Sequence, residues 1–168
     1  LIVPCLRSLE EMKKLVELAK FAPIGNRGFI KGRGSGFGYQ DWASGSVADF
    51  MAASNERLLV LPQCETAECL ENIEKVVAME GIDGIFIGPF DLSISLGLPG
   101  DFENPVFLAA VDRILAACKA AGKYCLIFTT STEKAREYLD HGFDGVAHNT
   151  DFTVFTEAFR SVVSEIRG

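Results

Sequence analysis

Two carboxylates stand where two successive predicted strands end. Glu65 closes an apolar run that begins at Leu61, and Asp91 follows the apolar run 85–87. Their separation along the chain is about one strand-helix-strand repeat, so adjacent parallel strands would bring the two carboxylates together. Close carboxylates repel each other unless a cation joins them. Hard oxygen ligands of this kind suit Mg²⁺ or Mn²⁺, so the sequence predicts a divalent-cation site.

The residues around the two carboxylates leave plainer interpretations open. Strand alternation places Gln63 on the same face as Glu65 and Cys64 on the other. As an alternative to metal binding, Glu65 interacts with the N-terminus of the following helix, whose dipole favours an anion. For Asp91, which follows a tight Gly-Pro turn, the alternative is an Asx-turn or a helix cap.

The elements that must position these side chains alternate between strand and helix. Predicted strands cover residues 1–4, 58–63, 85–87, 124–128 and 145–147. Predicted helices cover 8–19 (opened by the capping box Ser8-x-x-Glu11), 47–55, 67–79, 105–121, 132–141 and the segment after 151. Five strand-helix units predict an α/β fold with a parallel sheet, either open and doubly wound or part of a barrel. Both architectures place function at the carboxyl ends of the strands.

Composition narrows the classes of protein. The 168 residues carry 16 basic and 23 acidic side chains, a formal net charge of −7, without the basic stripe that a nucleic-acid partner needs. Hydrophobic residues make up 48% and support a sizeable core. No apolar run approaches a membrane span, and the first residues lack a signal peptide's basic flank, so we expect a cytoplasmic protein with no membrane partner. The five cysteines lack C-x-x-C spacing, which predicts reduced core thiols.

Two motifs resemble those of a known family. Gln63-Cys64-Glu65-Thr66 is similar to the Q-x-E-T strand of the HpcH/HpaI aldolases, which are metal-dependent class II pyruvate aldolases. The segment 81–93, GIDGIFIGPFDLS, is similar to that family's G-(V/I)-D-G-(V/I)-F-(I/V)-G-P-x-D-L-S motif. The resemblance implies a TIM (β/α)8 barrel. Residues 1–168 would form a single domain, the C-terminal portion of that barrel, carrying its last five strand-helix units.

The resemblance also implies roles for these residues. Glu65 and Asp91 would bind a divalent cation, Mg²⁺ or Mn²⁺ with Co²⁺ as an alternative, and the cation would hold pyruvate or another 2-oxo acid. Gln63 would orient the substrate or the metal's waters. Backbone N–H groups in the stretch that runs from Gly88 through Pro89 and Phe90 to Asp91 would receive the substrate carboxylate. The implied activity is a carbon-carbon lyase that cleaves a 4-hydroxy-2-oxo acid to pyruvate and an aldehyde through a metal-stabilised enolate.

Three other functional interpretations stay open. The same enolate chemistry serves oxaloacetate decarboxylation or cleavage of a related 2-oxo acid. A truncated, non-catalytic barrel module would keep the metal ligands without the reaction, and an open sheet unrelated to aldolases is the structural alternative. The Gly-rich segment 32–38 fails the tests for phosphate-binding motifs and is interpreted as a flexible rim loop.

The family's histidine base and pyruvate-binding arginine have no counterpart in this chain. The resemblance places both upstream of Leu1, so we expect little aldolase activity from these 168 residues alone. His148, near the end of the last predicted strand, is a weak candidate base, whereas His141 at a helix end is interpreted as structural. Five units also leave two sheet edges, which we expect either missing N-terminal residues of the same polypeptide or another chain to cover. Because the family forms oligomers through its terminal helices, the resemblance implies a homo-oligomer, with 152–166 as a candidate interface.

Overall fold

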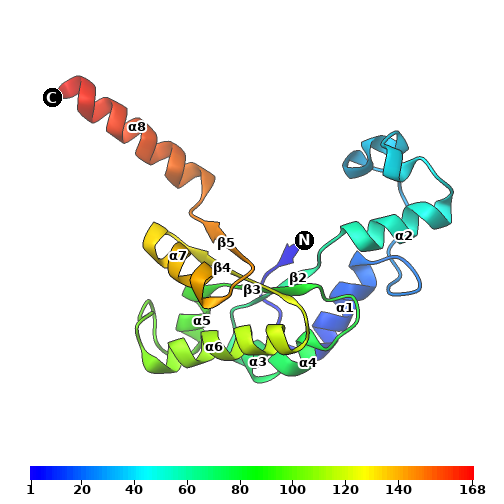
Figure 1. Cartoon of the computed structure of the whole chain (residues 1–168), viewed down its shortest axis with the longest axis horizontal. Helices are drawn as coiled ribbons and strands as arrows, with labels where there is room; N and C mark the ends of the chain where they lie inside the picture. Colours follow the sequence, from blue (N-terminus) through cyan, green and yellow to red (C-terminus); the bar gives the residue numbers. More distant parts are fainter.

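The computed structural model describes all 168 residues, and its centre is a five-stranded parallel sheet (Figure 1). The strands are β1 (Ile2–Val3), β2 (Leu61–Cys64), β3 (Gly84–Ile87), β4 (Tyr124–Thr129) and β5 (Gly145–His148). Their spatial order is the order of the chain, so β1 and β5 form the two edges. The predicted α/β alternation, the parallel sheet and the two open edges are confirmed.

The register of β2 and β3 brings the carboxyl ends of these strands level. Gln63 pairs with Phe86 and Cys64 with Ile87, and the Gly88 N–H donates to the Cys64 carbonyl at 3.3 Å. Glu65, which follows the last residue of β2, therefore lies beside the point where the chain leaves β3. The predicted adjacency of the two strand ends is confirmed.

Most of the helices agree with the prediction. They are α1 (Leu9–Ala19), α2 (Val47–Arg57), α3 (Ala67–Glu71), α4 (Ile73–Val77), α5 (Pro89–Ser95), α6 (Pro105–Ala120), α7 (Thr132–His141) and α8 (Asp151–Arg167), with the short 3₁₀ helices η1 (Arg33–Gly38) and η2 (Asp41–Ala43). The capping box of Ser8 and Glu11 at the start of α1 is confirmed.

Two helical predictions are wrong in detail. The helix expected over 67–79 breaks at Asn72, whose side chain donates to the Glu68 carbonyl at 3.0 Å and whose backbone leaves the helical region. Such local bonds compete with a continuous helix. The turn expected after β3 instead begins α5, in which Gly88 is the N-cap and Pro89 the first helical residue. Proline suits that position because its fixed φ is helical and it needs no N–H partner there.

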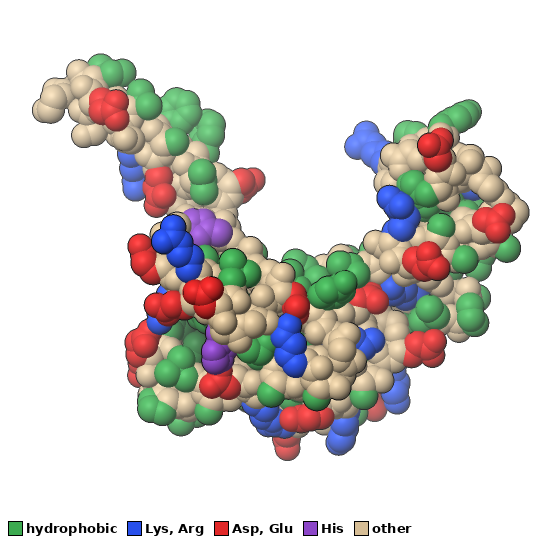
Figure 2. Space-filling view, in the orientation of Figure 1, with side chains coloured by type: hydrophobic (Ala, Val, Ile, Leu, Met, Phe, Trp, Pro, Cys, Tyr) green, Lys and Arg blue, Asp and Glu red, His purple; other side chains and the backbone are tan.

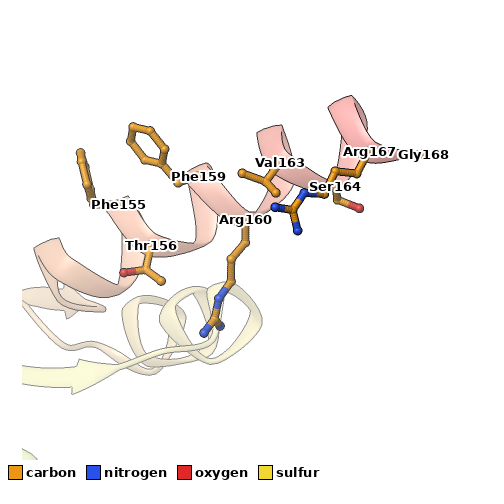
Figure 3. A pocket seen from close by; sticks show the side chains of 8 residues that line it. All are labelled: Phe155, Thr156, Phe159, Arg160, Val163, Ser164, Arg167 and Gly168. Carbon is orange, nitrogen blue, oxygen red and sulfur yellow. The ribbon is translucent and has the colours of Figure 1, made fainter.

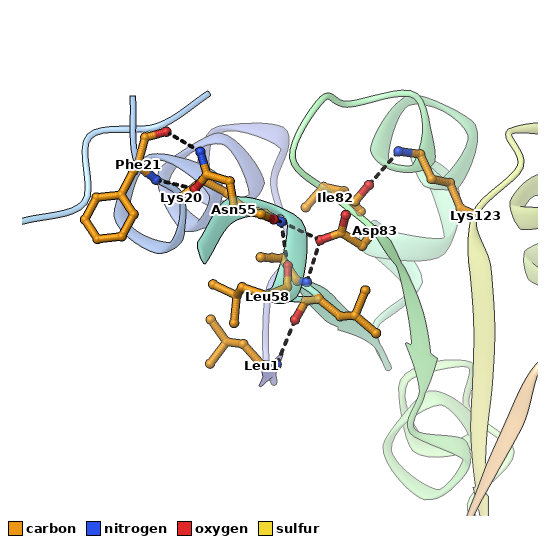
Figure 4. Close-up of polar contacts among 10 residues, drawn as sticks. Leu1, Lys20, Phe21, Asn55, Leu58, Ile82, Asp83 and Lys123 are labelled. Carbon is orange, nitrogen blue, oxygen red and sulfur yellow. Dashed lines mark hydrogen bonds and ion pairs between the residues drawn. The ribbon is translucent and has the colours of Figure 1, made fainter. Parts of the chain in front are cut away.

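A buried lysine ties α1 and α2 to the sheet (Figure 4). Lys20, 2% exposed, donates to the carbonyls of Asn55 and Leu58 at 2.8 and 2.5 Å and lies 2.9 Å from Asp83 Oδ2. The same carboxylate oxygen accepts the Val60 N–H at 2.8 Å. Because Leu58 caps α2, β2 begins at Leu61, three residues later than predicted.

The main core lies between the sheet and the helices and contains 18 buried residues. Four cysteines belong to it, as predicted: Cys64, Cys69, Cys118 and Cys125. The prediction is wrong for Cys5, which is exposed where the chain leaves β1. No helix is both long and apolar enough to cross a membrane.

Two arms extend from this body and leave a hollow between them (Figure 2). One arm is α8, in which no residue is buried. Phe155 and Phe159 project from one side of α8, with ring centroids 4.7 Å apart, while Arg160 points to the other side (Figure 3). The other arm carries η1, η2 and α2. There, the Gly-rich segment predicted as a loop forms 3₁₀ turns, and Trp42 stacks on Phe50 at 5.5 Å.

Candidate active site

Glu65 is a buried carboxylate at the carboxyl end of β2. It is 4% exposed. Its Oε1 accepts the backbone N–H of Cys5 at 2.6 Å, and its Oε2 accepts the Gln63 amide, so these two residues face each other as strand alternation predicts. The ion pairs of the structure do not include Glu65. A buried carboxylate without a counter-ion is costly, which favours a cation at this position.

The alternative interpretation of Glu65 does not describe its contacts. The N-terminus of α3 is capped by Thr66, whose hydroxyl accepts the Cys69 N–H at 3.1 Å, and the Ala67 N–H donates to Ser95 Oγ at 2.8 Å. The carboxylate of Glu65 instead turns to Cys5 and the sheet rim.

Asp91 lies in the first turn of α5, beside the end of β3. It is exposed, and α5 has no side-chain capping bond, so the cap interpretation of Asp91 is not supported. An acid in a first helical turn is favoured by the helix dipole. The Asp91 oxygens therefore remain available to a ligand.

The two carboxylates act on one thiol. The hydrogen bond and charge of Glu65 raise the pKa of the Cys5 thiol above its usual range, and the charge of Asp91 adds a smaller rise. The negative charges of both acids therefore act on the Cys5 thiol at this rim. The role of Cys5 was missed at the sequence level, because its N–H reaches a residue 60 positions away.

Gly88 provides the space in which the Glu65 carboxylate lies. A Cβ on Gly88 would lie 2.8 Å from Glu65 Oε2 and closer still to Gln63 Nε2. The absence of a side chain at this position therefore forms a cradle around the carboxylate. Pro89 is buried and Phe90 half-exposed at the same rim.

The donor set fits a hard divalent cation. Glu65 and Asp91 supply carboxylate oxygens, and no group of three or more His, Cys, Asp or Glu side chains forms a ready-made metal cage. Mg²⁺ commonly binds through one or two carboxylates and completes its shell with water and substrate oxygens. These residues fit a magnesium-like cation better than a zinc-like one, which prefers nitrogen and sulfur ligands.

Neither histidine bonds to Glu65 or Asp91. His148 is exposed at the end of β5, three strands from β2, which corresponds to about 14 Å along a sheet. His141 ends α7 and its Nε2 lies 2.9 Å from Asp112 Oδ1. The structural interpretation of His141 agrees with this contact.

Comparison with known proteins gives consistent matches over almost the whole chain. The sequence model of the HpcH/HpaI aldolase/citrate lyase family matches residues 1–158. A hydroxypyruvate/pyruvate aldolase of Chromohalobacter salexigens is 34% identical over 169 residues, covering 100% of this chain and 64% of the relative. A 4-hydroxy-2-oxo-heptane-1,7-dioate aldolase of Shigella flexneri is 31% identical, covering 98% and 60%.

A solved structure agrees with these sequence matches. The crystal structure of an HpcH/HpaI aldolase/citrate lyase family protein from Burkholderia cenocepacia J2315 superposes with a TM-score of 0.83 at 31% identity. The match covers 99% of this chain and 64% of that one, so the chain forms part of such a barrel. The family match, the sequence identities and the shared fold together establish that the chain belongs to the HpcH/HpaI aldolase/citrate lyase family.

Proposed function

We propose that the protein is a divalent-metal-dependent aldolase that cleaves a 4-hydroxy-2-oxo acid to pyruvate and an aldehyde. The observation that carries the proposal is the buried Glu65 carboxylate, which has no cationic partner and lies beside the rim that bears Asp91. Family membership supports the reaction class, since relatives 31–34% identical are named as aldolases.

Different residues of this chain have different roles in binding the cation and the substrate. Glu65 and Asp91 hold the cation, Mg²⁺, Mn²⁺ or Co²⁺, and the backbone N–H of Cys5 keeps Glu65 Oε1 in place. The Gln63 amide orients Glu65 Oε2 and, through its carbonyl, a water or substrate hydroxyl. Gly88 and Pro89 close the site on the β3 side, and the free backbone N–H groups of Phe90 and Asp91 in the first turn of α5 receive the substrate carboxylate, since the Gly88 N–H already donates to the Cys64 carbonyl.

Cleavage needs a Lewis acid and a base. A bound divalent cation supplies the Lewis acid for the enolate that forms as the bond between C3 and C4 breaks. The 4-hydroxyl proton leaves to a base, and the electron pair enters the pyruvate enolate, which then takes a proton. A positioned base is typically worth about 10²- to 10⁴-fold in rate. His148 is distant from Glu65 in this structure, so we expect slow turnover from residues 1–168 alone.

Calorimetry with Mn²⁺ tests the metal site directly. Glu65→Gln and Asp91→Asn should each weaken Mn²⁺ binding at least about 100-fold, because even the outer partners of metal ligands are worth about 10- to 100-fold. Glu68→Gln, an exposed acid in α3, is the matched control and should bind normally. Unchanged affinity in both site variants, with circular dichroism showing an intact fold, would refute the site assignment.

A pyruvate-release assay separates the reaction from the metal site. We expect metal-dependent binding of oxalate, a mimic of the pyruvate enolate, by the 168-residue chain. Turnover of a 4-hydroxy-2-oxo acid should rise when the chain is extended at its N-terminus to the length of its relatives. Equal turnover by both proteins would make His148 the leading candidate base. Oxaloacetate decarboxylation without aldol cleavage would favour the related lyase activity instead.

A further inference from the structure

A cavity opens beside the proposed site, between α6 and α7. It has a volume of about 410 Å³, within the usual range for small-molecule sites. Pro89 and Phe90, which directly precede Asp91, form one end of it, and Thr129 and Thr130 at the carboxyl end of β4 lie on the same rim. The cavity therefore shares Pro89 and Phe90 with the proposed site.

Aromatic rings form the walls near this rim. The Phe90 ring meets Phe102 edge-on with centroids 5.0 Å apart and lies 6.3 Å from the ring of Phe128. Tyr138, half-buried on α7, lines the cavity further in, together with Leu108 of α6. Phe90 keeps 48% of its surface exposed, so the wall is open to a ligand rather than sealed within the core. Rings of this kind stack favourably on another flat apolar group.

The charges of the cavity disfavour an anion. Its lining carries three acids, Glu103, Asp112 and Glu137, against one lysine, Lys134, and His141. Lys134 is held by Glu137 at 2.9 Å and Glu103 at 3.1 Å, and these two acids raise the pKa of Lys134 to about 12. With its lysine already paired to two acids, the lining repels a carboxylate and accepts an uncharged group at lower cost.

We propose that this cavity receives the aldehyde-derived end of the substrate and selects an uncharged aromatic or apolar group there. The inference rests on the proposed aldolase function and adds the class of aldehyde. This uncharged substrate end differs from that of the substrate named for the Shigella flexneri relative, a heptane-1,7-dioate, which ends in a second carboxylate. Phe90 would contact that end of the substrate through its ring.

Binding of uncleavable 2-oxo acids tests the proposal. With Mn²⁺ present, calorimetry on the 168-residue chain should give 2-oxo-4-phenylbutanoate an affinity about tenfold or more above those of pyruvate and 2-oxoheptanedioate. Phe90→Ala should abolish this preference, while Phe37→Ala, which removes a 64% exposed ring outside the cavity, should retain it. Leu108→Trp, which fills the cavity, should also abolish it and serves if Phe90→Ala misfolds. Equal affinities for the three acids would overturn the proposal.

A second measurement distinguishes failure of the proposed aromatic selectivity from failure of the proposed aldolase function. Ligand-observed NMR without metal should detect benzyl alcohol in the cavity of wild-type protein and not in Leu108→Trp. If benzyl alcohol binds but all three oxo acids fail to bind with Mn²⁺, the metal site is wrong. If pyruvate binds with Mn²⁺ and the phenyl group adds nothing, the metal site stands and the aromatic selectivity is refuted.

Discussion

Substituting Gly88 with alanine tests whether the space beside Glu65 exists for the carboxylate. Gly88 has φ −96° and ψ 89°, a backbone conformation open to alanine, so strain in the backbone does not confuse the result. The new Cβ would lie 2.8 Å from Glu65 Oε2, whereas ordinary contacts begin at 3.4 Å. The carboxylate must therefore retreat by about 0.6 Å, roughly three times the tolerance of about 0.2 Å in a metal-ligand distance.

The displacement should weaken Mn²⁺ binding without removing a ligand atom. We expect an affinity about 10- to 100-fold lower, comparable to the loss of an orienting partner, and a free energy of unfolding lower by about 1–3 kcal/mol from overpacking. Isothermal calorimetry measures the first quantity and urea unfolding the second. The two effects are separable, because metal affinity is measured under conditions in which the variant remains folded.

Gly34→Ala is the matched control for this substitution. Gly34 has no atom within 4 Å of an added Cβ and no left-handed φ, so alanine there should change neither quantity. If folded Gly88→Ala bound Mn²⁺ as tightly as the wild-type protein, Glu65 Oε2 would not be a ligand. The proposed site would then have to be rebuilt around other atoms.

Four further outcomes are expected. Lys20→Met should lower the free energy of unfolding by about 2–4 kcal/mol in urea titrations, since buried carbonyls and a carboxylate lose their donor; an unchanged midpoint would contradict the role of Lys20. The Arg113 guanidinium lowers the pKa of Glu74 from 4.5 to about 2. The contribution of ionised Glu74 to the free energy of unfolding is therefore present above pH 4.5 and is lost as the pH falls toward 2. Stability curves of wild type and Glu74→Gln, less than about 1 kcal/mol apart at neutral pH, should converge in acid, and a constant gap would refute this. An aromatic disulfide reagent should modify Cys5 alone in the folded chain, because the other four thiols are buried; rapid reaction of a second thiol would argue against the core. If α8 joins subunits, Phe155→Glu combined with Phe159→Glu should reduce the mass measured by sedimentation, and an unchanged mass would exclude this face as the interface.

The sequence was sufficient to predict the sheet and the meeting of two strand ends. Two paired parallel strands are usually joined by a helix. Because Glu65 and Asp91 are separated by one strand-helix-strand repeat, the sequence already implies that they follow neighbouring strands of the sheet. The structure agrees, with β2 and β3 in register at Cys64 and Ile87. Local signals such as the Ser8 capping box also sufficed, because capping depends only on residues three positions apart.

Other parts of the site could not be predicted, for physical reasons that differ. The seven residues of α5 are too few to display a helical period, and Gly88-Pro89 suits either a turn or a helix start. The bond from Cys5 N–H to Glu65 joins residues far apart in sequence, and Cys5 adopts a φ of 62° that no neighbouring residue signals. The aromatic cavity likewise depends on how α5, α6 and α7 pack, which a periodicity within one element does not encode.

The sequential order of the strands has a consequence for synthesis on the ribosome. Each strand after β1 finds its partner already made, and Cys5, Glu65 and Asp91 all precede α6, which ends at Ala120, 29 residues after Asp91. At elongation rates of about 5–20 residues per second, α6 is complete roughly 1.5–6 s after Asp91. During that interval the nascent chain already carries both acids, and a divalent cation would neutralise them before α6 covers the growing sheet. The proposed cofactor would then act first as a folding template and only afterwards as a catalyst.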